Sequence, residues 1–218
     1  MKKALLALAL AAAAASAGAV TIGFENEFSG GTNCANALTG CSILEVTQTA
    51  TGVHFDLQGT MAPGEFITSL YGNYAGGPLA ISNVSGTGAS AYEGYSFSSN
   101  AFKADGDGYF DWKIDLSSNP PRFDGIDVLS WDFAGAVLPL FNSISVDGPL
   151  GKTGFLFATH AQGLTDGGSG WFNGQLTPTS TPFDVTPIPE PETYALMLAG
   201  LAVVGGIARR RQRAENAR

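Results

Sequence analysis

The chain has 218 residues, of which 11 are basic and 19 acidic, and 44% of its side chains are hydrophobic, a composition typical of a globular protein. The charge is uneven, because residues 20–186 contain four basic and sixteen acidic side chains and so carry a net charge of −12. A body this acidic repels phosphate backbones, so we expect no nucleic-acid binding. The 29 glycines favour turns and strands over an all-α fold.

The N-terminus has the pattern of an export signal. Two lysines precede an apolar run over residues 4–15, and small side chains follow. This order predicts a secretory signal peptide over residues 1–19, with Ala17 and Ala19 at the cleavage site and Val20 as the mature N-terminus. A buried N-terminal helix is the alternative.

Cys34 and Cys41 are the only two cysteines. Export would place them where disulfides persist, so we predict a bridge between them. In the chain-entropy model this bridge stabilises the fold by about 2–3 kcal/mol. The alternative is a metal site, for which two cysteines without nearby histidines supply too few ligands to close a zinc site.

Alternating polar and apolar residues dominate the body of the chain. The clearest case is the segment 110–116, in which Phe110, Trp112, Ile114 and Leu116 share one face and charged residues share the other. Further predicted strands are 43–48, 53–58, 66–71, 79–84, 92–97, 129–133, 143–146, 154–159 and 171–176, with turn residues between them. We therefore expect many short strands, each with one polar face.

These strands need a second sheet to cover their apolar faces. The sequence thus predicts an all-β fold, a single β-sandwich of jelly-roll type over residues 20–183. A β-helix is the alternative, although no short repeat is visible.

Three carboxylates stand close together in a glycine-rich turn, at Asp105, Asp107 and Asp111. Hard oxygen ligands on such a turn suit calcium, although the spacing matches the EF-hand loop only in part. A plain turn with solvated aspartates is the alternative. No cofactor is required by any other motif, and calcium is the one ion that the sequence suggests.

Tryptophans are the side chains that most often stack on sugars in a binding site, and the chain has three. Trp112 and Trp131 fall on apolar strand faces and are expected in the core. Trp171 follows a loop rich in glycine and serine, so it is the candidate ligand contact. The two histidines, His54 and His160, belong to no recognisable catalytic arrangement, and we predict that the protein is not an enzyme.

The C-terminus combines three features in a fixed order. Residues 184–193 form a proline-rich linker, and an apolar run of 15 residues over 194–208 is followed by an arginine cluster that would stop it in a membrane. At about 1.5 Å per residue this helix is shorter than the ~30 Å hydrocarbon core, which favours a temporary anchor. The residues concerned are Pro189, Glu190 and Pro191 in the linker and Arg209, Arg210 and Arg211 in the tail.

This C-terminal region, residues 184–218, resembles the PEP-CTERM sorting domain, which is also catalogued as the ice-binding protein C-terminal domain. The resemblance implies recognition by exosortase, a membrane-embedded protease or transpeptidase-like enzyme of Gram-negative bacteria that make exopolysaccharide. It implies sorting and processing and does not extend to the body of the protein. An ordinary C-terminal membrane anchor is the alternative.

Together these features predict an exported, non-enzymatic protein with an inner-membrane intermediate and a final place at the cell surface or in the extracellular matrix. Its expected partners are an exosortase-like enzyme, the inner membrane during transit, and exopolysaccharide. The alternative functions are a secreted carbohydrate-binding module and, after that, a polysaccharide hydrolase.

Overall fold

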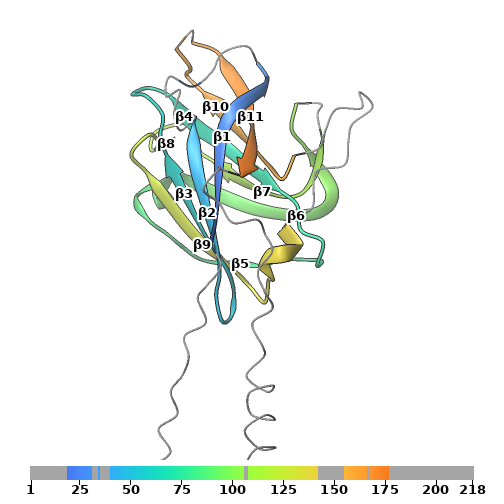
Figure 1. The fold of residues 1–218 in the computed structure, drawn as a ribbon. Helices are drawn as coiled ribbons and strands as arrows, with labels where there is room; N and C mark the ends of the chain where they lie inside the picture. The colour runs from blue at the N-terminus through green and yellow to red at the C-terminus, as the bar shows by residue number, and fades with distance from the viewer. Residues whose placement is uncertain are drawn as a thin grey trace, which may run out of the picture. The chain divides into compact units, whose positions relative to one another are not determined.

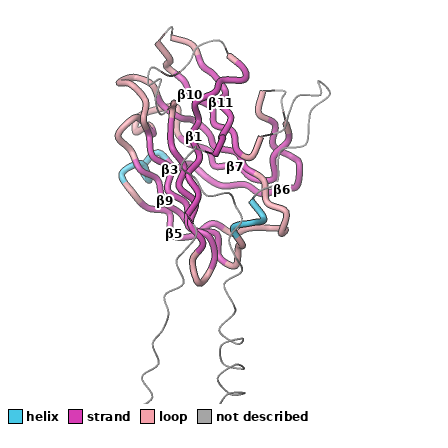
Figure 2. Tube along the Cα trace, in the orientation of Figure 1, coloured by secondary structure: helices cyan, strands magenta, loops and turns pink. Residues whose placement is uncertain are grey.

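The computed structural model describes residues 19–30, 34, 40–105, 108–141, 155–165 and 167–176. All of them fall within one compact unit, Ser16–Asp184. Within these ranges the chain forms eleven strands and two short 3₁₀-helices, and no α-helix (Figures 1 and 2). The predicted all-β class is confirmed.

The strands are short and follow one another closely along the chain. They are β1 (Ala19–Ser29), β2 (Ser42–Gln48), β3 (Gly52–Gly59), β4 (Phe66–Gly72), β5 (Ile81–Ser85), β6 (Tyr92–Lys103), β7 (Tyr109–Leu116), β8 (Phe123–Asp124), β9 (Val128–Ala134), β10 (Phe157–Gln162) and β11 (Ser169–Leu176), with the 3₁₀-helices η1 (Thr87–Ala91) and η2 (Leu138–Phe141). In β7 the predicted inner face, Phe110 to Leu116 at every second residue, is buried. Alternation of apolar and polar side chains therefore determines which face of this strand meets the core.

All eleven described strands belong to a single sheet, in the order β5-β9-β3-β2-β1-β11-β10-β4-β7-β6, with β8 paired to β4. The structure thus differs from the predicted sandwich of two separate sheets. The reason is that β1 pairs with β2 on one side and with β11 on the other, which joins the two layers edge to edge. The sheet curls on itself and is nearly closed into a barrel.

The edges of this sheet are β5 and β6. No β5–β6 ladder forms among the described strands, and a side chain bridges the gap instead. The Tyr95 hydroxyl of β6 donates to the Leu79 carbonyl, just before β5, at 3.2 Å, and its ring packs on Phe133 of β9 with centroids 5.3 Å apart. One tyrosine therefore holds the two edges near each other.

The core inside the curled sheet is aromatic. Phe55 of β3 stacks on Trp131 of β9 with ring centroids 5.2 Å apart, and it meets Trp112 of β7 edge-on at 6.1 Å. Both tryptophans are fully buried, which confirms their expected place in the core. Because β3 and β7 lie far apart in the strand order, these contacts hold the two halves of the sheet face to face.

The first and last described strands are neighbours. Ile22 near the start of β1 pairs with Leu176 at the end of β11, and Ser29 at the other end of β1 pairs with Trp171. The chain therefore leaves the described region beside the point where it enters. No helix among the described residues is long and apolar enough to cross a membrane, and the predicted span over 194–208 lies outside them.

Candidate functional site

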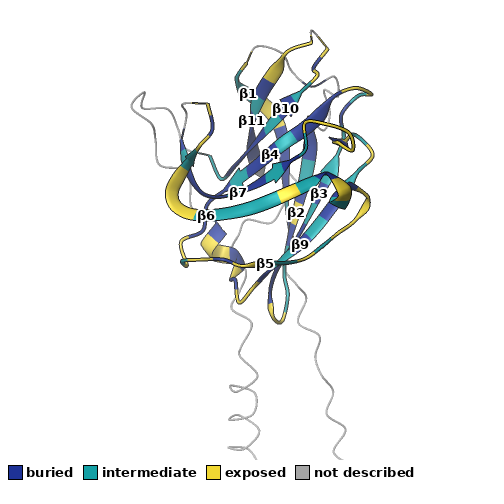
Figure 3. Ribbon diagram, turned by 180° about the vertical axis from the view of Figure 1, so that it is seen from behind, coloured by how far each residue is buried: buried dark blue, intermediate teal, exposed yellow. Residues whose placement is uncertain are grey.

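A depression of about 650 Å³ lies beside the β6 edge of the sheet. The loop after β4 and the middle of β6 form its walls. Figure 3 shows β6 as a long curved strand whose residues are mostly half-buried or exposed. The residues that line the depression include Asn73, Tyr74, Phe97, Ser99, Asn100 and Asp111.

A large, irregular bulge in β6 shapes one wall of the depression. Phe97 pairs with Trp112 and Phe102 with Phe110, so four residues of β6 stand opposite Asp111 alone. Asn100, within the bulge, has a positive φ of 50°. The bulge frees the backbone of residues 98–101 from the ladder with β7 and turns it toward the depression.

Asp111 holds both walls in place. Its Oδ1 accepts the backbone N–H of Asn100 at 2.9 Å, and its Oδ2 accepts the backbone N–H of Tyr74 at 3.0 Å. The side chain is 9% exposed, so both hydrogen bonds form in a largely desolvated position. A buried carboxylate paired with two amide donors is a strong structural clamp.

The predicted calcium ligands do not converge in the part of the chain that the structure describes. Asp111 serves the clamp, whereas Asp105 is exposed and accepts a hydrogen bond from the Ser29 hydroxyl. No group of three acidic, histidine or cysteine side chains with metal-binding geometry occurs among the described residues. Asp107 lies outside them, so calcium binding stays a prediction.

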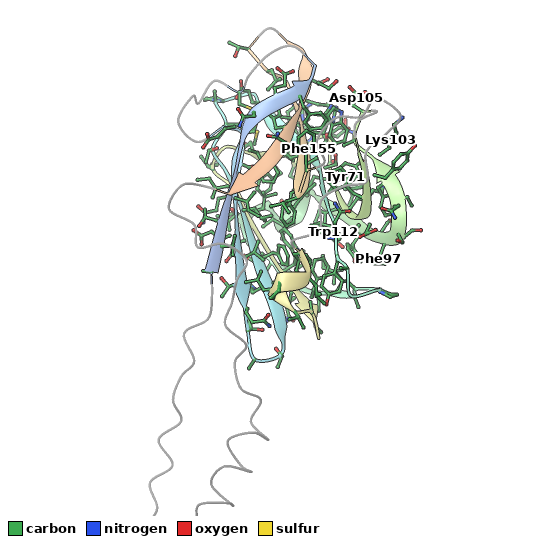
Figure 4. The ribbon with its side chains drawn as sticks, turned by 45° about the vertical axis from the view of Figure 1, so that its right-hand side comes forward. Tyr71, Phe97, Lys103, Asp105, Trp112 and Phe155 are labelled. Atoms are coloured by element: carbon green, nitrogen blue, oxygen red, sulfur yellow. A yellow bond between two sulfur atoms is a disulfide. The ribbon has the colours of Figure 1, made fainter. Side chains whose placement is uncertain are left out.

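Trp171 lies in a second aromatic cluster, away from the core around Phe55. Its ring stacks on His160 with centroids 4.7 Å apart and meets Tyr71 at 5.2 Å. Phe28, Phe102 and Phe155 are half-buried in the same cluster, around buried Phe110. Figure 4 labels Tyr71 and Phe155 of this cluster. Since His160 covers one face of the indole, a sugar has only the remainder of the ring to stack on. The role of Trp171 as a ligand contact stays a prediction.

Burial affects the ionisable groups of this cluster. It lowers the pKa of His160, against a smaller opposite effect of the Asp105 charge. It also raises the pKa of Tyr71. The Nδ1 atom of His160 lies 2.8 Å from the Thr68 hydroxyl, so the neutral imidazole is held by one hydrogen bond and one ring stack.

A polar array that sequence reasoning missed crosses the outer face of β3, β9 and β5. His54 Nδ1 lies 2.6 Å from Asp132 Oδ1, and His54 Nε2 lies 3.2 Å from Asp56 Oδ2. Asn83 of β5 donates to the second Asp132 oxygen at 2.6 Å. This hydrogen bond is the main reason that the pKa of Asp132 is lowered, and His54 adds to it. Through His54, Asp132 and Asn83 the array links β3 and β9 and ties edge strand β5 to the sheet.

Comparison with known families concerns the C-terminal region alone. Residues 187–212 match the family model of the PEP-CTERM protein-sorting motif. The chain carries a PEP-CTERM motif. No curated protein and no solved structure matches the chain. The resemblance drawn from the sequence is thus confirmed, and the PEP-CTERM match includes the proline-rich linker from Pro187 onward and the arginines up to residue 211.

Most residues of the two export signals lie outside the described residues. These are Ala17, the PEP-CTERM residues Pro189, Glu190 and Pro191, and the arginines Arg209, Arg210 and Arg211. Ala19 is described: it is exposed, begins β1 and pairs with Thr47. Val20, the next residue, is buried in the sheet. Cleavage after Ala19 would therefore remove the exposed first residue of β1 and keep the buried part of the strand.

The predicted disulfide between Cys34 and Cys41 is present, with Cα atoms 5.3 Å apart. Cys41 is fully buried, and its backbone N–H donates to the Phe24 carbonyl of β1 at 3.1 Å. The bridge therefore closes the connection between β1 and β2 next to the sheet. Because both sulfurs are oxidised, the pair does not supply thiolate ligands to a metal.

Proposed function

We propose that this PEP-CTERM protein is exported, passes through an inner-membrane intermediate and is processed by an exosortase-like enzyme. The mature protein then acts at the cell surface or in the extracellular matrix, without catalytic activity. The PEP-CTERM match over residues 187–212 is the observation that carries this proposal, because the motif implies exosortase processing.

The composition of the PEP-CTERM linker supports access by such an enzyme. Pro187, Pro189 and Pro191 each lack an amide donor and disfavour helix in the residue before them. A segment of this kind does not join the interior of a helix or a sheet. The sequence therefore favours a backbone that a protease can reach at this linker.

The body of the protein has two features that are typical of extracellular proteins. Its disulfide belongs to an oxidising compartment, and its acidic composition keeps it soluble among polysaccharides.

The test is the intact mass of the protein in the membrane and extracellular fractions of its native host. We expect a released species that begins at Val20 and ends near Pro189 to Pro191. Changing Pro189, Glu190 and Pro191 to alanine should abolish release, whereas the same change at Thr177, Pro178 and Thr179, before the linker, should not. A membrane-bound species that keeps its arginines in every sample would mean an ordinary anchor.

Exopolysaccharide is the matrix partner that we propose for the released body, so a carbohydrate-binding module is the second candidate function. The depression beside β6 favours it, because amide, carboxylate and aromatic groups meet there. Incubation of the purified protein with host polysaccharide separates binding from hydrolysis. Recovery of intact polymer fits a binding module, and shortened chains would mean a hydrolase.

A further inference from the structure

We propose that the depression between the loop after β4 and the β6 bulge is a binding site for a neutral or amino saccharide. The proposal rests on the proposed function, since it assigns the polysaccharide contact of the body to one place. It differs from the sequence prediction, which points to Trp171. The depression combines unused hydrogen-bonding capacity, an apolar surface and a single negative charge.

The side-chain oxygen of Asn73 is a hydrogen-bond acceptor that has no donor partner among the described residues. The residue is 2% exposed, and its Nδ2 reaches the Phe155 carbonyl only at 3.5 Å, the outer limit of a hydrogen bond. Its Oδ1 accepts no hydrogen bond from the described residues. This oxygen can therefore accept a hydrogen bond from a ligand hydroxyl.

Ser99 and Asp111 add a donor and further acceptors. Ser99 lines the depression and is exposed, and its hydroxyl can both donate and accept. Each Asp111 oxygen accepts one backbone N–H and has a second lone pair free. The depression can therefore both donate to and accept from a ligand that is rich in hydroxyl groups.

Phe97 supplies the apolar part of the depression. It is half-buried, and its ring stacks on no other aromatic ring in the described structure. An aromatic ring beside convergent polar groups suits a ligand with an apolar C–H face and hydroxyls at its rim. A pyranose ring has this shape. The volume of about 650 Å³ falls in the range of about 300–1,000 Å³ that is typical of ligand sites.

The charge of the depression selects among saccharides. Asp111 is the one charged side chain among the described residues that line it. A uronate or a phosphorylated sugar would bring a second negative charge close to this carboxylate with no cation to offset it, which is unfavourable. A neutral sugar meets no such repulsion, and an amino sugar gains attraction.

The test is binding of the full-length protein, purified in detergent micelles, to a panel of immobilised oligosaccharides with neutral, amino and uronic acid units. Binding to the best of them is then measured by titration calorimetry. Ser99→Arg places a long side chain in the depression from an exposed backbone position, and the exposed Ser118→Arg, in the turn after β7, is the matched control. Trp171→Ala tests the competing site, and thermal unfolding verifies that each variant is folded.

We expect neutral or amino oligosaccharides to bind, Ser99→Arg to weaken binding at least about tenfold, and Ser118→Arg and Trp171→Ala to leave it unchanged. Any of three results would overturn the proposal: no binding across the panel, a preference for uronic acids, or binding that survives Ser99→Arg. Processing is measured on the same variants. Normal release without glycan binding refutes the saccharide site alone, and glycan binding without release refutes the sorting proposal alone.

Discussion

The Asp111 side chain joins two segments of the fold that lie far apart in the sequence. From the sequence it belongs to a turn with two other aspartates, and a metal is the obvious partner for three carboxylates. In the structure its two oxygens are shared between the loop after β4 and the β6 bulge. The residue positions the walls of the depression, and neither segment can keep its place without it.

Asp111→Ala should therefore destabilise the protein by about 2–4 kcal/mol, because two backbone N–H groups lose a charged acceptor in a desolvated position. Chemical denaturation measures the change. Asp115→Ala on the same strand is the control: Asp115 pairs with Lys113 near the surface, and such pairs contribute about 0–1 kcal/mol. Equal effects of the two substitutions would contradict the clamp.

His160 should make stability depend on pH. Burial lowers the pKa of the folded residue below its ordinary value of 6.5, so the unfolded chain takes up this proton more readily than the folded chain. The stability that neutral His160 provides is complete above about pH 6.5, the ordinary pKa of the residue in the unfolded chain. It is lost as the pH falls from there to the lowered pKa of His160 in the folded protein. Below that value both states are protonated and the loss is constant.

Thermal unfolding at about pH 7.5 and about pH 5 measures this effect. The wild-type protein should lose more stability between the two conditions than His160→Gln, which keeps a polar group near Thr68 but does not titrate. His54→Gln removes the other histidine and serves as the control. An identical pH dependence in the wild type and His160→Gln would show that His160 does not contribute.

At the level of strands, local pattern predicted most of the sheet. The segments 43–48, 53–58, 66–71, 110–116, 129–133 and 171–176 fall within β2, β3, β4, β7, β9 and β11. Alternation works here because each of these strands has one face on the core. The predicted strand 154–159 begins before β10, 79–84 begins before β5, and 143–146 lies outside the described residues.

The elements that sequence reasoning missed depend on long-range pairing. β1 was not predicted because Asn26 interrupts its apolar face between Phe24 and Phe28, yet β2 and β11 pair with it on both sides. The depression was missed for the same reason. Asn73, Phe97 and Asp111 are 14 to 38 residues apart in the sequence, and only the β4–β7 and β6–β7 registers bring them together.

Gly72 at the end of β4 lets the core aromatics pack against the backbone. A Cβ atom at this position would lie 2.3 Å from the Trp112 ring and 2.9 Å from the Phe157 ring. Gly72→Ala should therefore cost about 1–3 kcal/mol, because neither buried ring has room to move. Gly94→Ala in β6 is the matched control, since its Cβ would meet nothing within 4 Å. Denaturation curves that coincide for the two variants would contradict the close contact.

The disulfide should stabilise the connection between β1 and β2. Its cysteines are seven positions apart, and closing a loop of this size contributes about 2.5 kcal/mol in the chain-entropy model. The double variant Cys34→Ala, Cys41→Ala should unfold at a correspondingly lower denaturant concentration. Reduction of the wild-type protein should reproduce the loss and should leave the double variant unaffected.

At the scale of the whole molecule, all the described strands precede the sorting motif. The last described strand ends at Leu176, and the PEP-CTERM match starts at residue 187. A chain that ends at residue 186 should therefore melt within about 2 °C of the full-length protein. A chain that ends at residue 168 lacks β11, the strand between β1 and β10, and should not fold. Circular dichroism of the two truncated chains measures both outcomes.

The position of β11 also determines how the body responds to a mechanical load. β11 is hydrogen-bonded on both sides, to β1 and to β10, and it is the last of the described strands in the chain. When the C-terminal end is held and flowing liquid drags on the body, the force acts on β11. This force shears the β1–β11 and β10–β11 ladders. Many hydrogen bonds must then break together instead of one at a time. A body held by its C-terminal end is thus anchored through a strand that has a neighbour on each side.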